Sequence, residues 1–121
     1  AIAVWGAEPE QAADAFESLR QRRRITDMVP DTICDGLRAY LGVLNFAILS
    51  EHVRGILLAA DAETIAAMRL MFDRLKVVAE PSCAVPLAAI LRHRQHFAGR
   101  RVGVIISGGN VDLDRLPWQV A

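Results

Sequence analysis

Short apolar runs alternate with longer segments of helical periodicity along this chain. Buried strands are predicted where mostly apolar residues follow one another, at 2–7, 56–60 and 102–106. Helices are predicted from Glu8-Pro9 onward with Ala12, Phe16 and Leu19 on one face, over 41–53, from Asp61 to Leu75, and from Ser82 to Arg92. Strands that alternate with helices of ten or more residues are typical of βαβ units. We therefore expect an α/β fold with a parallel sheet.

Two of these helices carry start signals in the sequence. Asp61 has the side chain of an N-cap residue, and Glu63 lies in the first turn, where the helix dipole favours negative charge. Ser82 is also suited to an N-cap, and Pro86 is then expected in the first turn, where a missing N–H is tolerated. We therefore expect Asp61 and Ser82 to cap the two helices.

Composition narrows the class of protein and of partner. The 121 residues suit one domain or a part of one, and the formal net charge is zero at pH 7. Without a basic surplus there is no electrostatic case for a nucleic acid or an anionic membrane as partner. The apolar runs are shorter than a membrane-spanning helix, and the start carries no charged leader. We expect a soluble, cytoplasmic protein.

The turn after the third predicted strand is the strongest pointer to a ligand. The strand at 102–106 is followed by Ser107-Gly-Gly-Asn110. Glycines let the backbone approach a ligand closely, and ligands of open α/β sheets bind at the carboxyl ends of the strands. A generic nucleotide-binding domain is a rival interpretation, but the chain has no Gly-x-Gly-x-x-Gly or Gly-Lys-Ser/Thr pattern. We therefore expect a ligand site of another kind at this turn.

Four motifs follow one another along the chain: Glu8-Pro9 with Asp14, Ile33-Cys-Asp-Gly-Leu37, Leu75-Lys-Val-Val-Ala-Glu-Pro-Ser82, and Ser107-Gly-Gly-Asn-Val-Asp-Leu113. In this order and with these gaps, they resemble the serine/threonine dehydratases and serine racemases, which are fold type II enzymes that use pyridoxal 5′-phosphate (PLP). The resemblance covers essentially the whole chain. It implies that 1–121 is a single α/β segment from the C-terminal part of the PLP-dependent large domain, with a partial three-layer parallel sheet and flanking helices.

The resemblance also implies what lies outside this segment. In the family, the lysine that forms a Schiff base with PLP, the glycine-rich phosphate loop and the contacts to the substrate carboxylate all lie upstream of the first strand. We therefore expect no catalytic residue in this chain, and we expect the small domain and the N-terminal part of the enzyme to be absent from it. Lys76 is the only lysine, and it is expected at the end of a helix, where a cation favours the helix dipole.

Four residues are implied as cofactor contacts. Ser107 resembles the family serine whose hydroxyl bonds the pyridine nitrogen of PLP, and Gly108 would let the backbone approach the ring. Glu80 resembles a family acid near the ring, and Gly36 resembles a glycine that borders its plane. Each has a structural alternative: a cap after the strand for Ser107, a helix-start acid for Glu80, and a loop position at positive φ for Gly36.

A divalent cation is implied near the first helix. Glu8, the backbone carbonyl of Ala12 and Asp14 match positions that hold a cation in the racemase and related dehydratases. Oxygen ligands of this kind suit Mg²⁺, Mn²⁺ or Ca²⁺, with water completing the coordination. The alternative is that the two acids serve only the dipole of the helix.

The two cysteines, Cys34 and Cys83, form no zinc or redox motif, so we expect reduced and buried thiols. Cys83 also departs from the family pattern, which usually has a small residue such as Gly or Ala after the serine of the Glu-Pro-Ser motif. Ala39-Tyr40 occupies a place where smaller polar residues are common. Both departures bear on substrate preference.

These features predict a segment of a PLP-dependent ammonia-lyase, an L-threonine or L-serine dehydratase that converts a β-hydroxy amino acid to a 2-oxo acid and ammonia. A serine racemase or a hydroxyaspartate ammonia-lyase of the same family is the first alternative. A non-catalytic remnant or interaction module is the second, because the Schiff-base lysine is missing. The expected partners are a small amino-acid substrate, the missing N-terminal part, and further copies in a homo-oligomer, since exposed sheet edges favour association.

Overall fold

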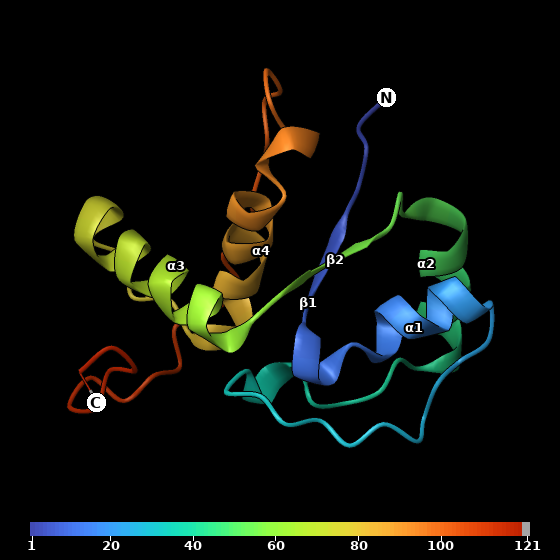
Figure 1. Cartoon of the computed structure of the whole chain (residues 1–121), viewed down its shortest axis with the longest axis horizontal. Coiled ribbons are helices and arrows are strands. Elements are labelled where there is room, and N and C mark those ends of the chain that lie inside the picture. Colours follow the sequence, from blue (N-terminus) through green and yellow to red (C-terminus); the bar gives the residue numbers. More distant parts are fainter. Residues whose placement is uncertain (120–121) are drawn as a thin grey trace.

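Two parallel strands form the centre of the structure, a computed structural model that describes residues 1–119. β1 (Gly6–Pro9) pairs with β2 (Ile56–Ala59), with Gly6 opposite Ile56 and Pro9 opposite Ala59. The helices are α1 (Asp14–Gln21), α2 (Val43–His52), α3 (Asp61–Leu75) and α4 (Pro81–Arg92), with 3-10 helices at Glu10–Ala12, Asp35–Leu37 and Arg94–His96. α3 and α4 lie to one side of the strands and α1 and α2 to the other (Figure 1). The predicted α/β fold with parallel strands and flanking helices is confirmed; residues 120–121 of the predicted segment lie outside the described residues.

The core lies where α4 packs against α3 and the two strands. The buried face of α4 carries small and medium side chains: Cys83, Ala84, Val85, Ala88 and Ala89. Met68 and Met71 of α3 fill the space beside them. The C-terminal segment returns along α3, where the rings of Phe72 and Trp118 lie with centroids 5.8 Å apart. The N-terminal end of α4 is therefore held by a packed core.

The third predicted strand, 102–106, does not form. Residues 101–110 have no regular secondary structure, and Ile105 is 82% exposed. A strand needs a neighbour for its backbone hydrogen bonds, and within residues 1–119 the sheet contains only β1 and β2. The first strand likewise begins at Gly6 rather than Ile2, where its pairing with β2 starts. The two predictions went wrong because an apolar run does not by itself supply a pairing edge.

The starts of α1 and α3 are acids inside the helix rather than caps before it. α1 begins at Asp14, and Glu8-Pro9 belongs to β1 instead of opening a helix. α3 begins at Asp61, with Ala60 as the N-cap residue, so the predicted cap is one residue off. The Glu63 carboxylate accepts the Ala60 N–H at 2.8 Å, which is half of a capping box.

The start of α4 also differs from the prediction. Glu80 is the N-cap residue and Pro81 the first helical residue, so Ser82 does not cap the helix. A proline ring has no N–H and is favoured at the first helical position, which explains the earlier start. Pro86 then lies in the helix interior rather than in its first turn.

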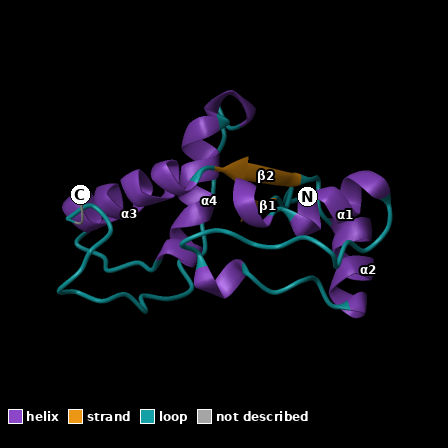
Figure 2. Cartoon of the chain, turned by 60° about the horizontal axis from the view of Figure 1, so that its bottom comes forward, coloured by secondary structure: helices purple, strands orange, loops and turns teal. Residues whose placement is uncertain are grey.

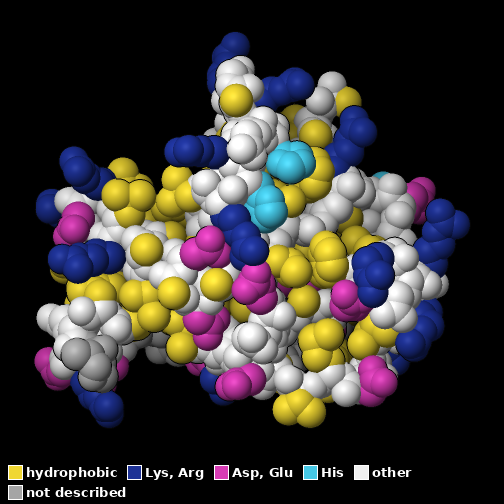
Figure 3. All heavy atoms as spheres, viewed as in Figure 1, with side chains coloured by type: hydrophobic (Ala, Val, Ile, Leu, Met, Phe, Trp, Pro, Cys, Tyr) yellow, Lys and Arg dark blue, Asp and Glu magenta, His cyan; other side chains and the backbone are white. Residues whose placement is uncertain are grey.

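Long loops and exposed apolar side chains make up much of the remaining surface. Figure 2 shows a long connection between α1 and α2 that is mostly loop, interrupted by the 3-10 helix Asp35–Leu37. Apolar residues such as Leu44 and Ile48 of α2 and Leu75 of α3 are exposed, and Figure 3 shows hydrophobic side chains spread over this face of the molecule. No helix in the described part of the chain is both long enough and apolar enough to cross a membrane.

Candidate cofactor-binding site

The predicted cofactor residues meet at the N-terminal end of α4. Glu80 takes an extended backbone as the N-cap residue, and Pro81 follows it in the first helical position. The first turn of a helix presents free N–H groups and a partial positive charge. Two segments from distant parts of the sequence contact this turn.

The first segment is the 3-10 helix that contains Gly36. The Gly36 N–H donates to Ser82 Oγ at 3.0 Å and to Asp35 Oδ1 at 2.9 Å. A Cβ atom on Gly36 would lie 2.9 Å from Ser82 Oγ. The alternative of a positive φ is wrong, since Gly99 is the only glycine in the described residues with that conformation. Close approach to α4 is therefore what favours glycine at this position.

Ser82 is a site residue whose role the sequence did not reveal. Its hydroxyl was expected to cap α4, whereas it accepts the N–H of Gly36 from 46 residues earlier in the chain. The available signal was its place beside Glu80 in the Glu-Pro-Ser motif. Ser82 thereby joins the Gly36 loop to the N-terminal turn of α4.

The second segment is the Ser-Gly-Gly turn. The Gly108 carbonyl oxygen accepts the Glu80 N–H at 3.2 Å and the Cys83 thiol at 2.8 Å. A Cβ atom on Gly108 would lie 1.9 Å from Glu80 Oε1, and a Cβ atom on Gly109 would lie 2.6 Å from the Val78 carbonyl oxygen. The turn therefore packs closely against residues 78–80. At Gly109 the neighbouring atom is backbone, which favours glycine, whereas at Gly108 it is the end of the flexible Glu80 side chain.

Ser107 stands next to this packed turn and is exposed. Its neighbour Gly108 contacts Glu80, and Glu80 is two residues from Ser82, which contacts Gly36. The structure thus gathers the four predicted cofactor residues, from three segments, around one helix end. An exposed hydroxyl, a carboxylate and two glycine backbones fit the polar edge and flat face of a pyridine ring, so the residues present fit PLP.

The two acids near α1, Glu8 and Asp14, accept hydrogen bonds from backbone N–H groups. Glu8 Oε1 accepts the Ala15 N–H at 3.1 Å and Oε2 accepts the Phe16 N–H at 2.8 Å, so β1 supplies a carboxylate to the start of α1. Asp14 Oδ2 accepts the Leu41 N–H at 3.0 Å. Burial, aided by the charge of Asp14, raises the pKa of Glu8 to about 7. The Glu8 contacts agree with the structural alternative of an acid that serves the start of α1, whereas the Asp14 contact ties α1 to the segment before α2.

The metal site remains a prediction. Among residues 1–119, no three or more His, Cys, Asp or Glu side chains gather closely enough to hold a metal ion. The predicted set of Glu8, the Ala12 carbonyl and Asp14 contains only two such side chains. A cation held there would depend on the backbone oxygen and on water.

Lys76 has the structural place that the sequence predicts. It is the C-cap residue of α3, with a left-handed backbone, and it is exposed. Its Nζ donates to the Asp73 carbonyl oxygen at 2.8 Å. The contact satisfies one of the last carbonyls of the helix, and the positive charge favours the helix dipole.

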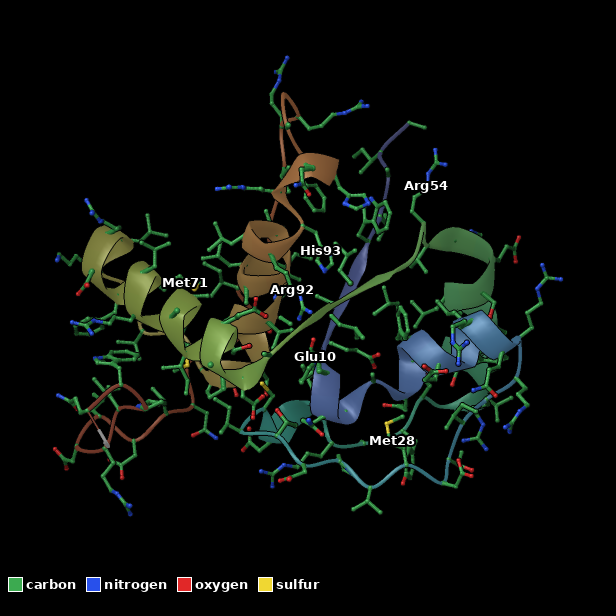
Figure 4. All side chains as sticks on the ribbon, viewed as in Figure 1. Glu10, Met28, Arg54, Met71, Arg92 and His93 are labelled. Atoms are coloured by element: carbon green, nitrogen blue, oxygen red, sulfur yellow. The ribbon has the colours of Figure 1, made fainter. Side chains whose placement is uncertain are left out.

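Ion pairs hold the other end of α4. Arg92 pairs with Glu10, which follows β1, and its Nη1 lies 3.3 Å from Glu63 Oε2 of α3. Figure 4 shows Arg92 and Glu10 pointing toward each other between α4 and the end of β1. The hydrogen bond to Glu10 raises the pKa of Arg92. These exposed ion pairs connect this end of α4 to the segment after β1 and to α3.

A model of the pyridoxal-phosphate dependent enzyme family matches residues 1–108. The chain belongs to the pyridoxal-phosphate dependent enzymes. This chain is 51% identical over 115 residues to the β-hydroxyaspartate dehydratase of Paracoccus denitrificans, covering 95% of the chain and 36% of that protein. It is 42% identical over 121 residues to the serine racemase of Dictyostelium discoideum, covering 95% and 37%. The chain spans little more than a third of the length of these relatives.

Solved structures give the same family and fold. A threonine deaminase from T.th. superposes with a TM-score of 0.86 at 42% identity, covering 92% of this chain and 36% of that one. Maize serine racemase superposes with a TM-score of 0.89 at 38% identity, covering 98% and 37%. The predicted resemblance to fold type II PLP enzymes is confirmed.

Proposed function

We propose that this chain forms the ring-binding part of a PLP-dependent ammonia-lyase that converts a small β-hydroxy amino acid to a 2-oxo acid and ammonia. The observation that carries the proposal is the convergence of Gly36, Glu80 and Gly108 on the N-terminal turn of α4, beside the exposed Ser107. The relatives support the same class, because they include a β-hydroxyaspartate dehydratase and a threonine deaminase.

Each residue at the helix end has a proposed task. The Ser107 hydroxyl would hydrogen-bond the pyridine nitrogen of PLP, and because a hydroxyl need not protonate the ring, the ring would remain a moderate electron acceptor. The Gly36 and Gly108 backbones leave room for the ring, and Ser82 holds the Gly36 loop in place. PLP, when bound, supplies the electron sink that acidifies Cα and lets the β-hydroxyl leave. The lysine that moves the proton is proposed to lie outside this chain.

The substrate within this class is L-serine or L-threonine, as the sequence motifs predict, or 3-hydroxyaspartate. 3-Hydroxyaspartate is favoured by the 51% identity to the β-hydroxyaspartate dehydratase, compared with 42% to the serine racemase of Dictyostelium discoideum. Racemisation of serine by the same site is the alternative reaction. All three substrates share the amino acid backbone and the β-hydroxyl, so they require the same ring site.

A structural cation is proposed at Glu8, the Ala12 carbonyl and Asp14. The support is the nearness of the buried Asp14 carboxylate to the half-buried Glu8 carboxylate. Burial raises the pKa of Glu8, with a smaller contribution from the charge of Asp14, and a nearby cation would favour the ionised form of both groups. We further propose that the full-length enzyme is a homo-oligomer, a proposal supported by the exposed apolar side chains of α2 and α3. A cytoplasmic location is proposed from the sequence alone.

The test uses the full-length protein, incubated with PLP and then with L-serine, L-threonine or each stereoisomer of 3-hydroxyaspartate. The 2-oxo acid and the ammonia are both quantified, and chiral chromatography measures racemisation of the remaining amino acid. Equal amounts of the two products from one of these substrates are expected. D-serine without 2-oxo acid would favour the racemase, and a protein with neither PLP absorbance nor product would be the non-catalytic remnant.

A further inference from the structure

The Cys83 thiol is buried where α4 meets the Ser-Gly-Gly turn. Cys83 lies in the first turn of α4 and is 2% exposed. Its Sγ lies 2.8 Å from the Gly108 carbonyl oxygen, which also accepts the Glu80 N–H at 3.2 Å. One carbonyl thus receives a side-chain donor and a backbone donor, both from the same helical turn.

The turn has few other restraints of its own. Residues 101–110 have no regular secondary structure, and Gly108 and Gly109 are the residues with the greatest backbone freedom. The backbone hydrogen bonds that hold this turn within the described residues run from Glu80 N–H to Gly108 and from Val111 N–H to Gly109. The contact from Cys83 is therefore one of the few hydrogen bonds that hold the Gly108 carbonyl, beside the packing of the turn against residues 78–80.

We propose that Cys83 is a positioning residue for the cofactor ring: its thiol holds the Gly108 carbonyl against α4 and thereby sets where the neighbouring Ser107 hydroxyl stands. The inference rests on the proposed function, because the contact between Cys83 and Gly108 can affect PLP binding only if the Ser107 hydroxyl binds the pyridine nitrogen. Cys83 touches neither cofactor nor substrate in this account. It acts through Gly108.

A smaller residue at position 83 would leave helix α4 intact but would remove the thiol that donates to the Gly108 carbonyl. With Ala or Gly there, the Gly108 carbonyl keeps only the longer backbone bond from Glu80. A thiol is a weak donor, but Cys83 is only 2% exposed, so its S–H group has little access to water as an alternative acceptor. Serine would restore a donor at this position, so Cys83→Ser serves as the conservative rescue.

The first measurement is amide hydrogen exchange in the full-length protein without PLP. The probes are the amides of Glu80 and Val111, whose hydrogen bonds end on the turn. We expect faster exchange at both amides in Cys83→Ala and near wild-type exchange in Cys83→Ser. Cys34→Ala is the matched control, because Cys34 is also fully buried in the same core. Equal exchange in Cys83→Ala and wild type would overturn the inference.

The second measurement is the dissociation constant of PLP, followed by absorbance. One hydrogen bond lost from the turn is expected to weaken PLP binding roughly two- to tenfold in Cys83→Ala, with recovery in Cys83→Ser and no change in Cys34→Ala. Tight binding by wild type with an unchanged constant in Cys83→Ala overturns this inference alone. A wild-type protein that binds no PLP overturns the proposed function and this inference together.

Discussion

The Glu80 carboxylate lies so close to Gly108 that a Cβ atom added to the glycine would be 1.9 Å from Oε1. The clashing atom is the end of a flexible side chain, which can move away. We therefore expect Gly108→Ala to displace the Glu80 carboxylate, weakening PLP binding with little loss of folding stability. PLP titration and denaturant titration of the full-length variant measure the two effects separately.

Gly109→Ala should behave differently. Its Cβ atom would meet the Val78 carbonyl oxygen at 2.6 Å, and backbone cannot move aside as a side chain does. A loss of about 1–3 kcal/mol in the free energy of unfolding is expected, measured by denaturant titration of the full-length protein. Gly103→Ala is the control, because nothing lies within 4 Å of its Cβ position. Equal losses of unfolding free energy in Gly108→Ala, Gly109→Ala and Gly103→Ala would contradict the close packing of Gly109 against the Val78 carbonyl.

The Gly36 and Ser82 contact predicts a coupled pair of substitutions. Gly36→Ala places a Cβ atom 2.9 Å from Ser82 Oγ, so it should push the loop away from α4 and weaken PLP binding. Adding Ser82→Ala removes that oxygen and should recover part of the affinity, although the Gly36 N–H then loses an acceptor. PLP titration of both single variants and the double variant gives the coupling energy. Strictly additive effects would contradict the contact.

Glu8 makes stability depend on pH. The folded pKa of about 7 exceeds the ordinary value of 4.5, so between these values the folded state binds more protons than the unfolded state. The free energy of unfolding should therefore fall as pH rises from about 4.5 to 7, in buffer with a chelator. Glu8→Gln should flatten this part of the curve, and Mg²⁺ or Mn²⁺ should flatten it in wild type if a cation takes the place of the proton.

Glu51→Gln provides the comparison for this pH series, because Glu51 is an exposed carboxylate on α2. Its curve should keep the wild-type slope. A wild-type slope in Glu8→Gln would mean that the Glu8 carboxyl titrates normally. If divalent ions changed neither the free energy of unfolding nor the calorimetric heat, the proposed cation site would be wrong. Glu8 and Asp14 would then only stabilise α1 through their hydrogen bonds.

The Arg92–Glu10 ion pair is a stability contact rather than a site contact. Both side chains are 37% exposed, so solvent screens the pair. Glu10→Gln should lower the free energy of unfolding by about 0.2–1 kcal/mol, and the loss should shrink near ~1 M salt. A loss that persists in high salt would indicate packing instead of charge.

The parts of the fold that depend on local pattern were predictable. The helical periodicity of α3 and α4 identified both helices, since an apolar face repeats along each. Both N-caps were misassigned. For α4, the start is decided by Pro81, which fits the first helical position better than Ser82 fits the cap. The strand at 102–106 failed for a different reason, since pairing depends on a neighbouring strand rather than on the run itself.

The candidate site was predictable in its members but not in its contacts. The motifs named Gly36, Glu80, Ser107 and Gly108, and the structure brings them to one helix end. The hydrogen bond from Cys83 to Gly108 spans 25 residues, and no spacing rule predicts such a contact. The same holds for Ser82, whose partner Gly36 lies in another loop.

The most direct test of the central claim is the affinity of the full-length protein for PLP with and without the Ser107 hydroxyl. Ser50→Ala is the control, since the Ser50 hydroxyl donates to the Phe46 carbonyl of its own helix. We predict that Ser107→Ala weakens PLP binding roughly two- to tenfold and shifts the absorbance of the bound cofactor, while Ser50→Ala changes neither. An unchanged dissociation constant and an unchanged spectrum in Ser107→Ala would contradict the account.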